Sequence, residues 1–269
     1  MNTAEVVPAT AMRPGSNGVT IPAVPDHCRV VGSIRPVDPA APLITFQVNL
    51  PVVWNGKLLQ FGGGGFNGTL VTATGPAFDN PPTQATPLVR GYVTAGTDSG
   101  HQSASLPEPQ AFALNNEALE NFAYASYKKV HDVALALVSA HYARPPARVY
   151  YMGTSEGGRE GLAMAQRFPQ DYDGIISRVP VLNWVGLQHV GWRGGVSQQR
   201  GGWLNPARVR LLQRAVLDGL RQGGVYSTAH KEGGSRIYAA GSSFVHSTFG
   251  DNESLDRFDD EAKFIAFLR

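Results

Sequence analysis

One serine flanked by glycines has the residue pattern best suited to covalent catalysis in this chain. Residues 153–157 read Gly-Thr-Ser-Glu-Gly, which fits the G-x-S-x-G pattern of a nucleophile elbow. In an elbow, a sharp turn from strand to helix exposes the serine oxygen, and the glycines relieve crowding. The backbone N–H that follows the serine then faces the oxyanion of the reacting carbonyl group. We therefore predict that Ser155 is a nucleophile and that the Glu156 amide is an oxyanion donor, whereas the Glu156 side chain need not take part.

A second glycine run could supply the other oxyanion donor. Residues 62–65 are four consecutive glycines, placed directly after a short apolar segment that is typical of a strand. An α/β hydrolase provides its second oxyanion amide at such a strand end, so we assign Gly64 and Gly65 as candidate donors. A tight loop is the alternative. A phosphate-binding P-loop is excluded because no Gly-Lys-Ser/Thr follows.

The general acid and base are not identified by the sequence. The expected order along the chain is serine, acid, histidine. Among the histidines, His101 follows a predicted strand that could end near the elbow, so we take it as a candidate neighbour of the site, with a structural hydrogen-bonding role as the alternative. His131 and His141 fall on a predicted helix, and His189 follows the strand after the elbow. The seven histidines are His27, His101, His131, His141, His189, His230 and His246.

The elements that must position these residues alternate between strand and helix patterns. Ile44 to Leu50 alternates apolar with polar residues, whereas Glu117 to Tyr142 repeats its apolar positions every three or four residues. Strands are expected over 44–50, 57–61, 92–95 and 149–152 and from 175, and helices over 117–142 and 160–167. This order predicts an α/β fold with a parallel sheet covered on both faces.

Composition limits the classes of function. The 269 residues are 42% hydrophobic and 16% charged, with a net charge of +2, which indicates a globular chain. Because there is no cluster of basic residues and no apolar run of about 18 residues, we expect neither nucleic-acid nor membrane partners. The single cysteine, Cys28, permits no intrachain disulfide and is expected to be a partly buried thiol. We see no signal peptide, and the sequence fixes neither the compartment nor the oligomeric state.

Several motifs, in order along the chain, resemble the tannase and feruloyl esterase family of serine esterases. The resemblance covers roughly residues 26–220. Its most specific part is the elbow with its extension Ser-Glu-Gly-Gly-Arg-Glu over 155–160. The other matching segments are 50–51, 54–56, 62–66, 97–101, 142–146, 161–162, 165–169 and 171–176.

The resemblance implies an α/β-hydrolase core with a lid inserted after the nucleophile region. It also implies hydrolysis of aromatic-acid esters, of the phenolic, tannin or feruloyl type, through an acyl-serine intermediate, with a small aromatic ester as the partner. We accordingly expect an irregular N-terminal segment over 1–25, a core over 26–195 and a partial lid-like region over 196–269. Members of the family are often secreted or periplasmic.

The sequence departs from the family in three places. Thr154 stands where the family usually has a cysteine bridged to a second cysteine beside the catalytic histidine. Asp218-Gly219 begins something like the family's calcium loop, but Gln222-Gly223 replaces the second Asp-Gly, so we expect no cofactor. The family's acid and histidine lie beyond a full lid, and residues 222–250 look too short for one. The core is therefore expected to lack its C-terminal part, and the alternative function is a truncated or catalytically dead member that at most binds such ligands.

Overall fold

A computed structural model describes residues 3–15, 20–77, 83–105 and 110–197, with 81, 108, 211, 235–237 and 252–255. The chain divides into two compact units, 1–184 and 185–269, so the expected core boundary at residue 195 falls inside the second unit. Helix α4 (Trp184–Ser197) begins at the last residue of the first unit and continues into the second. The second unit also holds the parallel pair β10 (Ser235–Ile237) and β11 (Asn252–Leu255). The candidate site belongs to the first unit.

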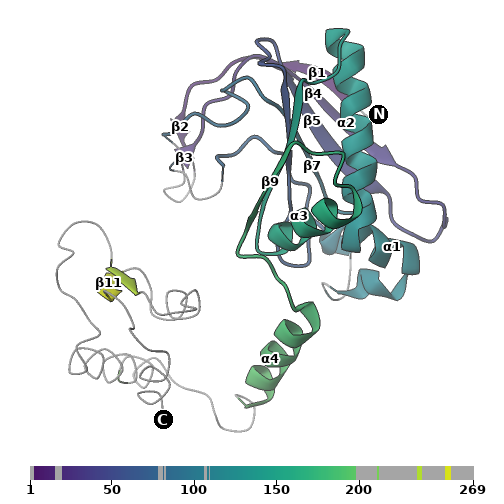
Figure 1. Cartoon of the computed structure of the whole chain (residues 1–269), viewed down its shortest axis with the longest axis vertical. Helices are drawn as coiled ribbons and strands as arrows, with labels where there is room; N and C mark the ends of the chain where they lie inside the picture. Colours follow the sequence, from purple (N-terminus) through teal and green to yellow (C-terminus); the bar gives the residue numbers. More distant parts are fainter. Residues whose placement is uncertain are drawn as a thin grey trace. The chain divides into compact units, whose positions relative to one another are not determined.

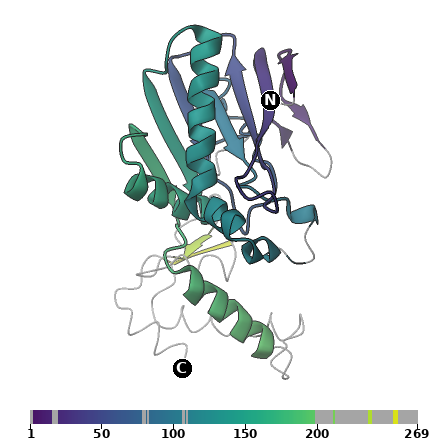
Figure 2. The same ribbon diagram turned by 90° about the vertical axis from the view of Figure 1, so that its right-hand side faces the viewer.

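A mixed sheet of seven strands forms the centre of the first unit (Figure 2). In spatial order the strands run β1-β4-β5-β7-β6-β8-β9, antiparallel from β1 to β7 and parallel from β7 to β9. Their bounds are β1 Thr3–Val7, β4 His27–Ile34, β5 Ile44–Pro51, β7 Val93–Thr97, β6 Lys57–Phe61, β8 Arg148–Thr154 and β9 Gly174–Arg178. The predicted parallel order holds for the four strands that surround the elbow.

The N-terminal strands differ from the expectation of an irregular segment over 1–25. Strand β1 pairs with β4 along its whole length, and an ion pair between Glu5 and Arg29 links the two strands. Two short strands, β2 (Arg13–Pro14) and β3 (Thr20–Ile21), pair with each other. The prediction was wrong because an exposed strand such as β1 owes its shape to its hydrogen-bonding partner and shows little apolar alternation in its own sequence.

The predicted helix over 117–142 is present, with a change of pitch near its start. Helix α1 (Asn116–Glu120) continues through a π-helical turn (Asn121–Ala125) into α2 (Ser126–Tyr142). Helix α3 (Glu156–Arg167) follows the elbow, and two short 3₁₀ segments cover Ser103–Ser105 and Ala111–Leu114. No helix in the described ranges combines the length and the apolar character that a membrane crossing requires.

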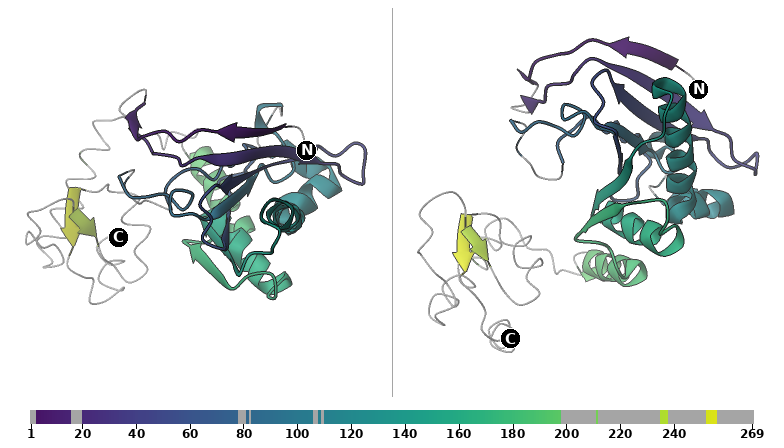
Figure 3. Two further views of the ribbon diagram at one scale, coloured as in Figure 1. Left: turned by 90° about the horizontal axis from the view of Figure 1, so that it is seen from above. Right: turned by 45° about the horizontal axis from the view of Figure 1, so that its top comes forward.

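Helices α2 and α3 pack on the same face of the sheet (Figures 1 and 3). Val130 and Val138 of α2 join a buried cluster with Leu58 and Val93 of the sheet. Met164 of α3 is fully buried against Tyr151 of β8. The contact between Met164 and Tyr151 joins α3 to β8, the two elements on either side of the elbow.

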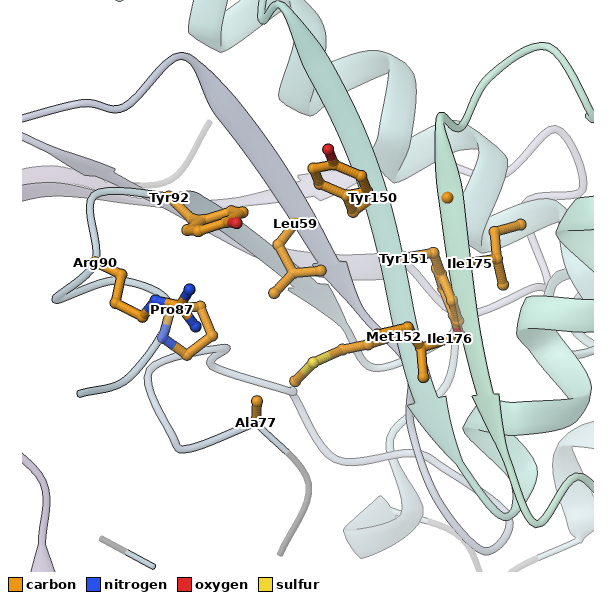
Figure 4. Close-up of a pocket in the computed structure, with 11 residues that line it drawn as sticks. Leu59, Ala77, Pro87, Arg90, Tyr92, Tyr150, Tyr151, Met152, Ile175 and Ile176 are labelled. Carbon is orange, nitrogen blue, oxygen red and sulfur yellow. The ribbon is translucent and has the colours of Figure 1, made fainter. Parts of the chain in front are cut away.

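The opposite face of the sheet is covered differently. Leu59, Phe61 and Met152 pack against a loop that contains Ala73. An apolar pocket of about 410 Å³ opens beside them, and Ile176 on its rim is 57% exposed (Figure 4). Among the described residues, helices α2 and α3 therefore cover one face of the sheet, and the loop that contains Ala73 packs on the other.

Candidate active site

Ser155 occupies a sharp turn between β8 and α3. Its backbone has φ 59° and ψ −116°, a region that non-glycine residues rarely adopt. The Ser155 amide donates to the Arg178 carbonyl oxygen at 2.9 Å, which ties the turn to the end of β9. The residue is exposed, so the hydroxyl is not part of the packed core. This geometry is the one that a nucleophile elbow requires.

The glycines around Ser155 are required by close backbone contacts. A Cβ atom on Gly153 would lie 2.1 Å from the carbonyl oxygen of Gly157. A Cβ atom on Gly157 would lie 2.7 Å from the carbonyl oxygen of Gly63, and one on Gly158 would lie 2.6 Å from that of Arg178. The contact between Gly157 and Gly63 brings the tetraglycine loop against the elbow.

The amides that could hold an oxyanion differ in their present partners. The Glu156 amide, at the N-terminus of α3, has no hydrogen-bond acceptor among the described residues, and neither has that of Gly65. The Gly64 amide donates to Asn67 Oδ1 at 2.7 Å. Gly64 and Gly65 are both exposed. The two free amides are suited to bind developing negative charge, whereas the Gly64 amide would have to share or leave its present acceptor.

The Glu156 side chain turns away from solvent and pairs with Arg159. Glu156 is 0% exposed, and its Oε1 lies 2.6 Å from Arg159 Nε. Glu156 Oε2 is buried without a hydrogen-bond partner in the described structure. Burial raises the pKa of Glu156, while the Arg159 guanidinium opposes that rise. Arg159 also donates to the carbonyl oxygens of Phe122 and Ala123 in the π-helical turn, at 3.1 and 2.8 Å.

A second buried carboxylate, missed by the sequence analysis, contacts the tetraglycine loop. Glu160 is 0% exposed and accepts hydrogen bonds from the Gly63 amide at 2.9 Å and from Asn67 Nδ2 at 2.7 Å. The Tyr151 hydroxyl lies 3.0 Å from Glu160 Oε2. Position 160 lies one helical turn after Glu156, so the pair shares a helix face. That spacing was the available signal, but the sequence did not show what the face would meet.

His101 lies in a buried position beside the loop that follows the glycines. Its Nε2 is 2.8 Å from the Phe66 carbonyl oxygen, and its ring stacks on Phe112 with centroids 3.9 Å apart. Burial lowers the pKa of His101, which favours a neutral ring whose Nε2–H donates to Phe66. These contacts are those of a structural hydrogen-bonding residue, the alternative role for His101, and not those of a general base.

The remaining histidines give no base for Ser155. His27 and His131 are buried, with Nδ1 of His27 on the Pro25 carbonyl oxygen and Nε2 of His131 on that of Asp171. Within the described ranges, no histidine hydrogen-bonds to the Ser155 hydroxyl. His230, His246, the calcium-loop candidates at 218–223 and most of the expected lid over 196–269 lie outside the described residues.

One cluster has the donor types of a metal site. His131, Asp132 and Asp171 place ligand atoms within 4.8 Å of one another. The Lys128 ammonium, however, lies 2.7 Å from Asp132 Oδ1 and 2.9 Å from Asp171 Oδ2. A cation of the protein itself thus already pairs with both carboxylates, which makes this cluster a poor fit for a metal ion.

The strained backbone at Ser155 predicts that glycine at this position stabilises the fold, although it removes the hydroxyl group. We expect S155G to unfold with a free energy about 1–2 kcal/mol larger than S155A, because glycine adopts a φ of 59° without a Cβ clash. Both variants lack the hydroxyl, so the comparison isolates the backbone. Urea denaturation followed by circular dichroism measures the difference, and an S155G variant less stable than S155A would show that the turn is not strained.

Comparison with known proteins identifies the chain with one family of esterases. Residues 28–220 match the family model described as "Tannase and feruloyl esterase". An uncharacterized esterase from Agrobacterium fabrum is 46% identical over 203 residues, which are 72% of this chain and 36% of that protein. Mono(2-hydroxyethyl) terephthalate hydrolase from Piscinibacter sakaiensis is 37% identical over 224 residues, or 80% of this chain and 36% of the hydrolase.

A solved structure shows the same fold. The crystal structure of feruloyl esterase B from Aspergillus oryzae superposes with a TM-score of 0.57 at 25% identity, covering 71% of this chain and 36% of that one. The chain therefore spans about a third of the length of the relatives that it matches.

Proposed function

Because the chain belongs to the tannase and feruloyl esterase family, we propose that it bears the nucleophile of a carboxylic ester hydrolase acting on aromatic-acid esters. The observation that carries this proposal is the exposed Ser155, held at φ 59° at the N-terminus of α3 and close to the tetraglycine loop. Strain of this kind persists where the surrounding structure enforces it, and it is common at catalytic residues. The α/β-hydrolase fold supports the same reaction class.

The proposed reaction proceeds in two acyl transfers. Ser155 Oγ attacks the ester carbonyl carbon and loses its proton, and the amide of Glu156 with that of Gly64 or Gly65 binds the resulting oxyanion. The alcohol leaves with a proton, which gives an acyl-Ser155 intermediate. Water then attacks the acyl group, releases the carboxylic acid and returns the proton to Ser155. No described histidine is assigned as the general base.

The proposed substrate class follows from the relatives. Their names specify a terephthalate monoester hydrolase and feruloyl esterases, whose substrates share an aromatic acid joined to an alcohol. We propose a small ester of this class as the partner of Ser155.

A specific observation favours a second candidate function. Ser155 has no histidine partner within the described ranges, and a serine hydroxyl without a base is a weak nucleophile at neutral pH. The second candidate is a catalytically inactive member of the family that binds aromatic esters without turning them over.

Two assays on the full chain separate the candidates. A fluorophosphonate probe with peptide mapping reports on the reactivity of Ser155, and hydrolysis of methyl ferulate, methyl gallate and mono(2-hydroxyethyl) terephthalate reports on turnover. We expect labelling at Ser155 and release of the aromatic acid. Folded protein that is unlabelled and inactive, but shifts its melting temperature with an aromatic ester, would support the binding candidate and contradict the esterase.

A further inference from the structure

A buried polar network connects the helix that carries the nucleophile to the tetraglycine loop. Glu160 lies on α3, one turn after Glu156, and its carboxylate is wholly shielded from solvent. It accepts the Gly63 amide at 2.9 Å through Oε2 and the Asn67 side-chain amide at 2.7 Å through Oε1. Tyr151 of β8 places its hydroxyl 3.0 Å from Oε2. One carboxylate therefore contacts the strand before the elbow and two positions of the loop.

The groups around Glu160 call for a carboxylate. The Gly63 amide and the Asn67 side-chain amide are donors. The single proton of the Tyr151 hydroxyl can go either to Glu160 Oε2 or to the Gly157 carbonyl oxygen, which lies 3.1 Å away. A carboxylate has two oxygens that only accept, so it can satisfy both amide donors in the absence of water. A glutamine at the same place would turn an NH₂ group toward at least one donor.

Asn67 extends the network to the next glycine. Its backbone has φ 59°, a left-handed conformation that asparagine tolerates better than most residues. Asn67 Oδ1 accepts the Gly64 amide at 2.7 Å while its Nδ2 donates to Glu160. The amides of Gly63 and Gly64 are thus held by Glu160, directly and through Asn67. The exposed Gly65 amide is left without an acceptor among the described residues.

We propose that Glu160 is a positioning residue for ester hydrolysis, because it holds the oxyanion loop at a fixed place relative to Ser155. This inference rests on the proposed function. Ser155 and the Glu156 amide stand at the start of α3, and Glu160 on the same helix fixes the loop that supplies the second donor. Motion of the loop would displace that donor from the oxyanion, and a displacement of about 1 Å can cost roughly a hundredfold in rate. Glu160 touches no substrate in this role.

Glu160→Gln tests the inference with little change in side-chain volume. We expect kcat to fall about 10- to 100-fold, with KM changing by less than about twofold, because the donor acts on the transition state and not on the bound ester. The rate of fluorophosphonate labelling at Ser155 should fall by a similar factor. Glu120→Gln, an exposed change on α1, is the matched control and should keep the kcat of the wild type.

A second variant, N67G, keeps the inference testable if E160Q fails to fold. Asn67→Gly keeps the backbone freedom needed at φ 59° but removes the link between Glu160 and Gly64. We expect a several-fold fall in kcat and in labelling rate. Wild-type kcat and labelling rate in both folded variants, or a loss confined to KM, would overturn the positioning role.

Amide hydrogen exchange gives a readout that does not depend on activity. We expect peptides covering 62–67 to exchange faster in E160Q and N67G than in E120Q. N67G removes the acceptor of the Gly64 amide, and E160Q replaces one of the two oxygens that hold the Gly63 amide and Asn67 with an NH₂ group. Equal exchange rates in all three variants would refute the inference even if the wild type proved inactive. An inactive and unlabelled wild type with faster exchange in both variants would instead contradict the proposed function alone.

Discussion

Replacing Ser155 by alanine is expected to lower kcat for aromatic ester hydrolysis by about 10³- to 10⁶-fold, the range found when a serine hydrolase loses its nucleophile. The reason is that no acyl-enzyme forms without Oγ, so any residual rate comes from water attacking an ester that is held by the oxyanion donors. Fluorophosphonate labelling should disappear in the same variant. Because Ser155 is exposed, the free energy of unfolding should change by less than about 1 kcal/mol.

Ser139→Ala is the matched control for this experiment. Ser139 is an exposed serine on α2, so its loss should affect neither labelling nor hydrolysis. Unchanged labelling of S155A at another serine would place the nucleophile elsewhere and remove the basis for the proposed function. Lost labelling together with an early urea transition would mean that the variant is misfolded, and S155G, with its relaxed backbone, then takes its place.

The elbow could be predicted because its constraints are local. A Cβ atom on Gly153 would meet the backbone of Gly157, four residues further along the chain, so the need for glycine at position 153 arises within the elbow itself. Two strands of the sheet, β5 and β6, could also be predicted from local sequence. Strand β6 has the expected bounds, and β5 extends one residue further than expected, because runs of buried apolar residues in a sheet are a strong periodic signal.

Features that depend on distant partners could not be predicted. Glu160 meets Gly63 and Asn67 across more than ninety residues of sequence. The π-helical turn over 121–125 is another case, since two of its carbonyl oxygens accept hydrogen bonds from Arg159, on a different helix. A single sequence shows that Glu156, Arg159 and Glu160 share a helix face, but the surface that this face contacts is determined only by the fold.

The contacts of Arg159 with Glu156 and with the π-helical turn lead to the second large predicted effect, a loss of stability. We expect Arg159→Met to lower the free energy of unfolding at pH 8 by about 3–5 kcal/mol, the usual cost of leaving one partner of a buried ion pair alone. Glu156 is fully buried, and one of its oxygens has no hydrogen bond in the described structure even with Arg159 in place. The methionine also leaves the carbonyl oxygens of Phe122 and Ala123 without their donor.

The pH dependence identifies the cause of this destabilisation. Removing the guanidinium leaves burial to raise the pKa of Glu156 further above its ordinary value of 4.5. A carboxyl group whose pKa is raised in the folded state destabilises the protein as pH rises above its unfolded pKa, because only the unfolded chain then ionises freely. The deficit of R159M relative to the wild type should therefore be small near pH 4.5 and grow toward pH 8.

Urea unfolding of R159M, E156Q and the double variant at both pH values measures this coupling. In the double variant no charge remains in the buried pair, so we expect it to recover much of the stability that R159M loses at pH 8. Arg167→Met, an exposed change on the same helix, should cost less than about 1 kcal/mol at either pH. If R159M lost the same stability at both pH values and E156Q restored none of it, the loss would belong to the carbonyl hydrogen bonds of the π-helical turn. The Glu156 carboxylate would then be tolerated without a cationic partner, and the short Glu156–Arg159 contact would not be what stabilises the start of the nucleophile helix.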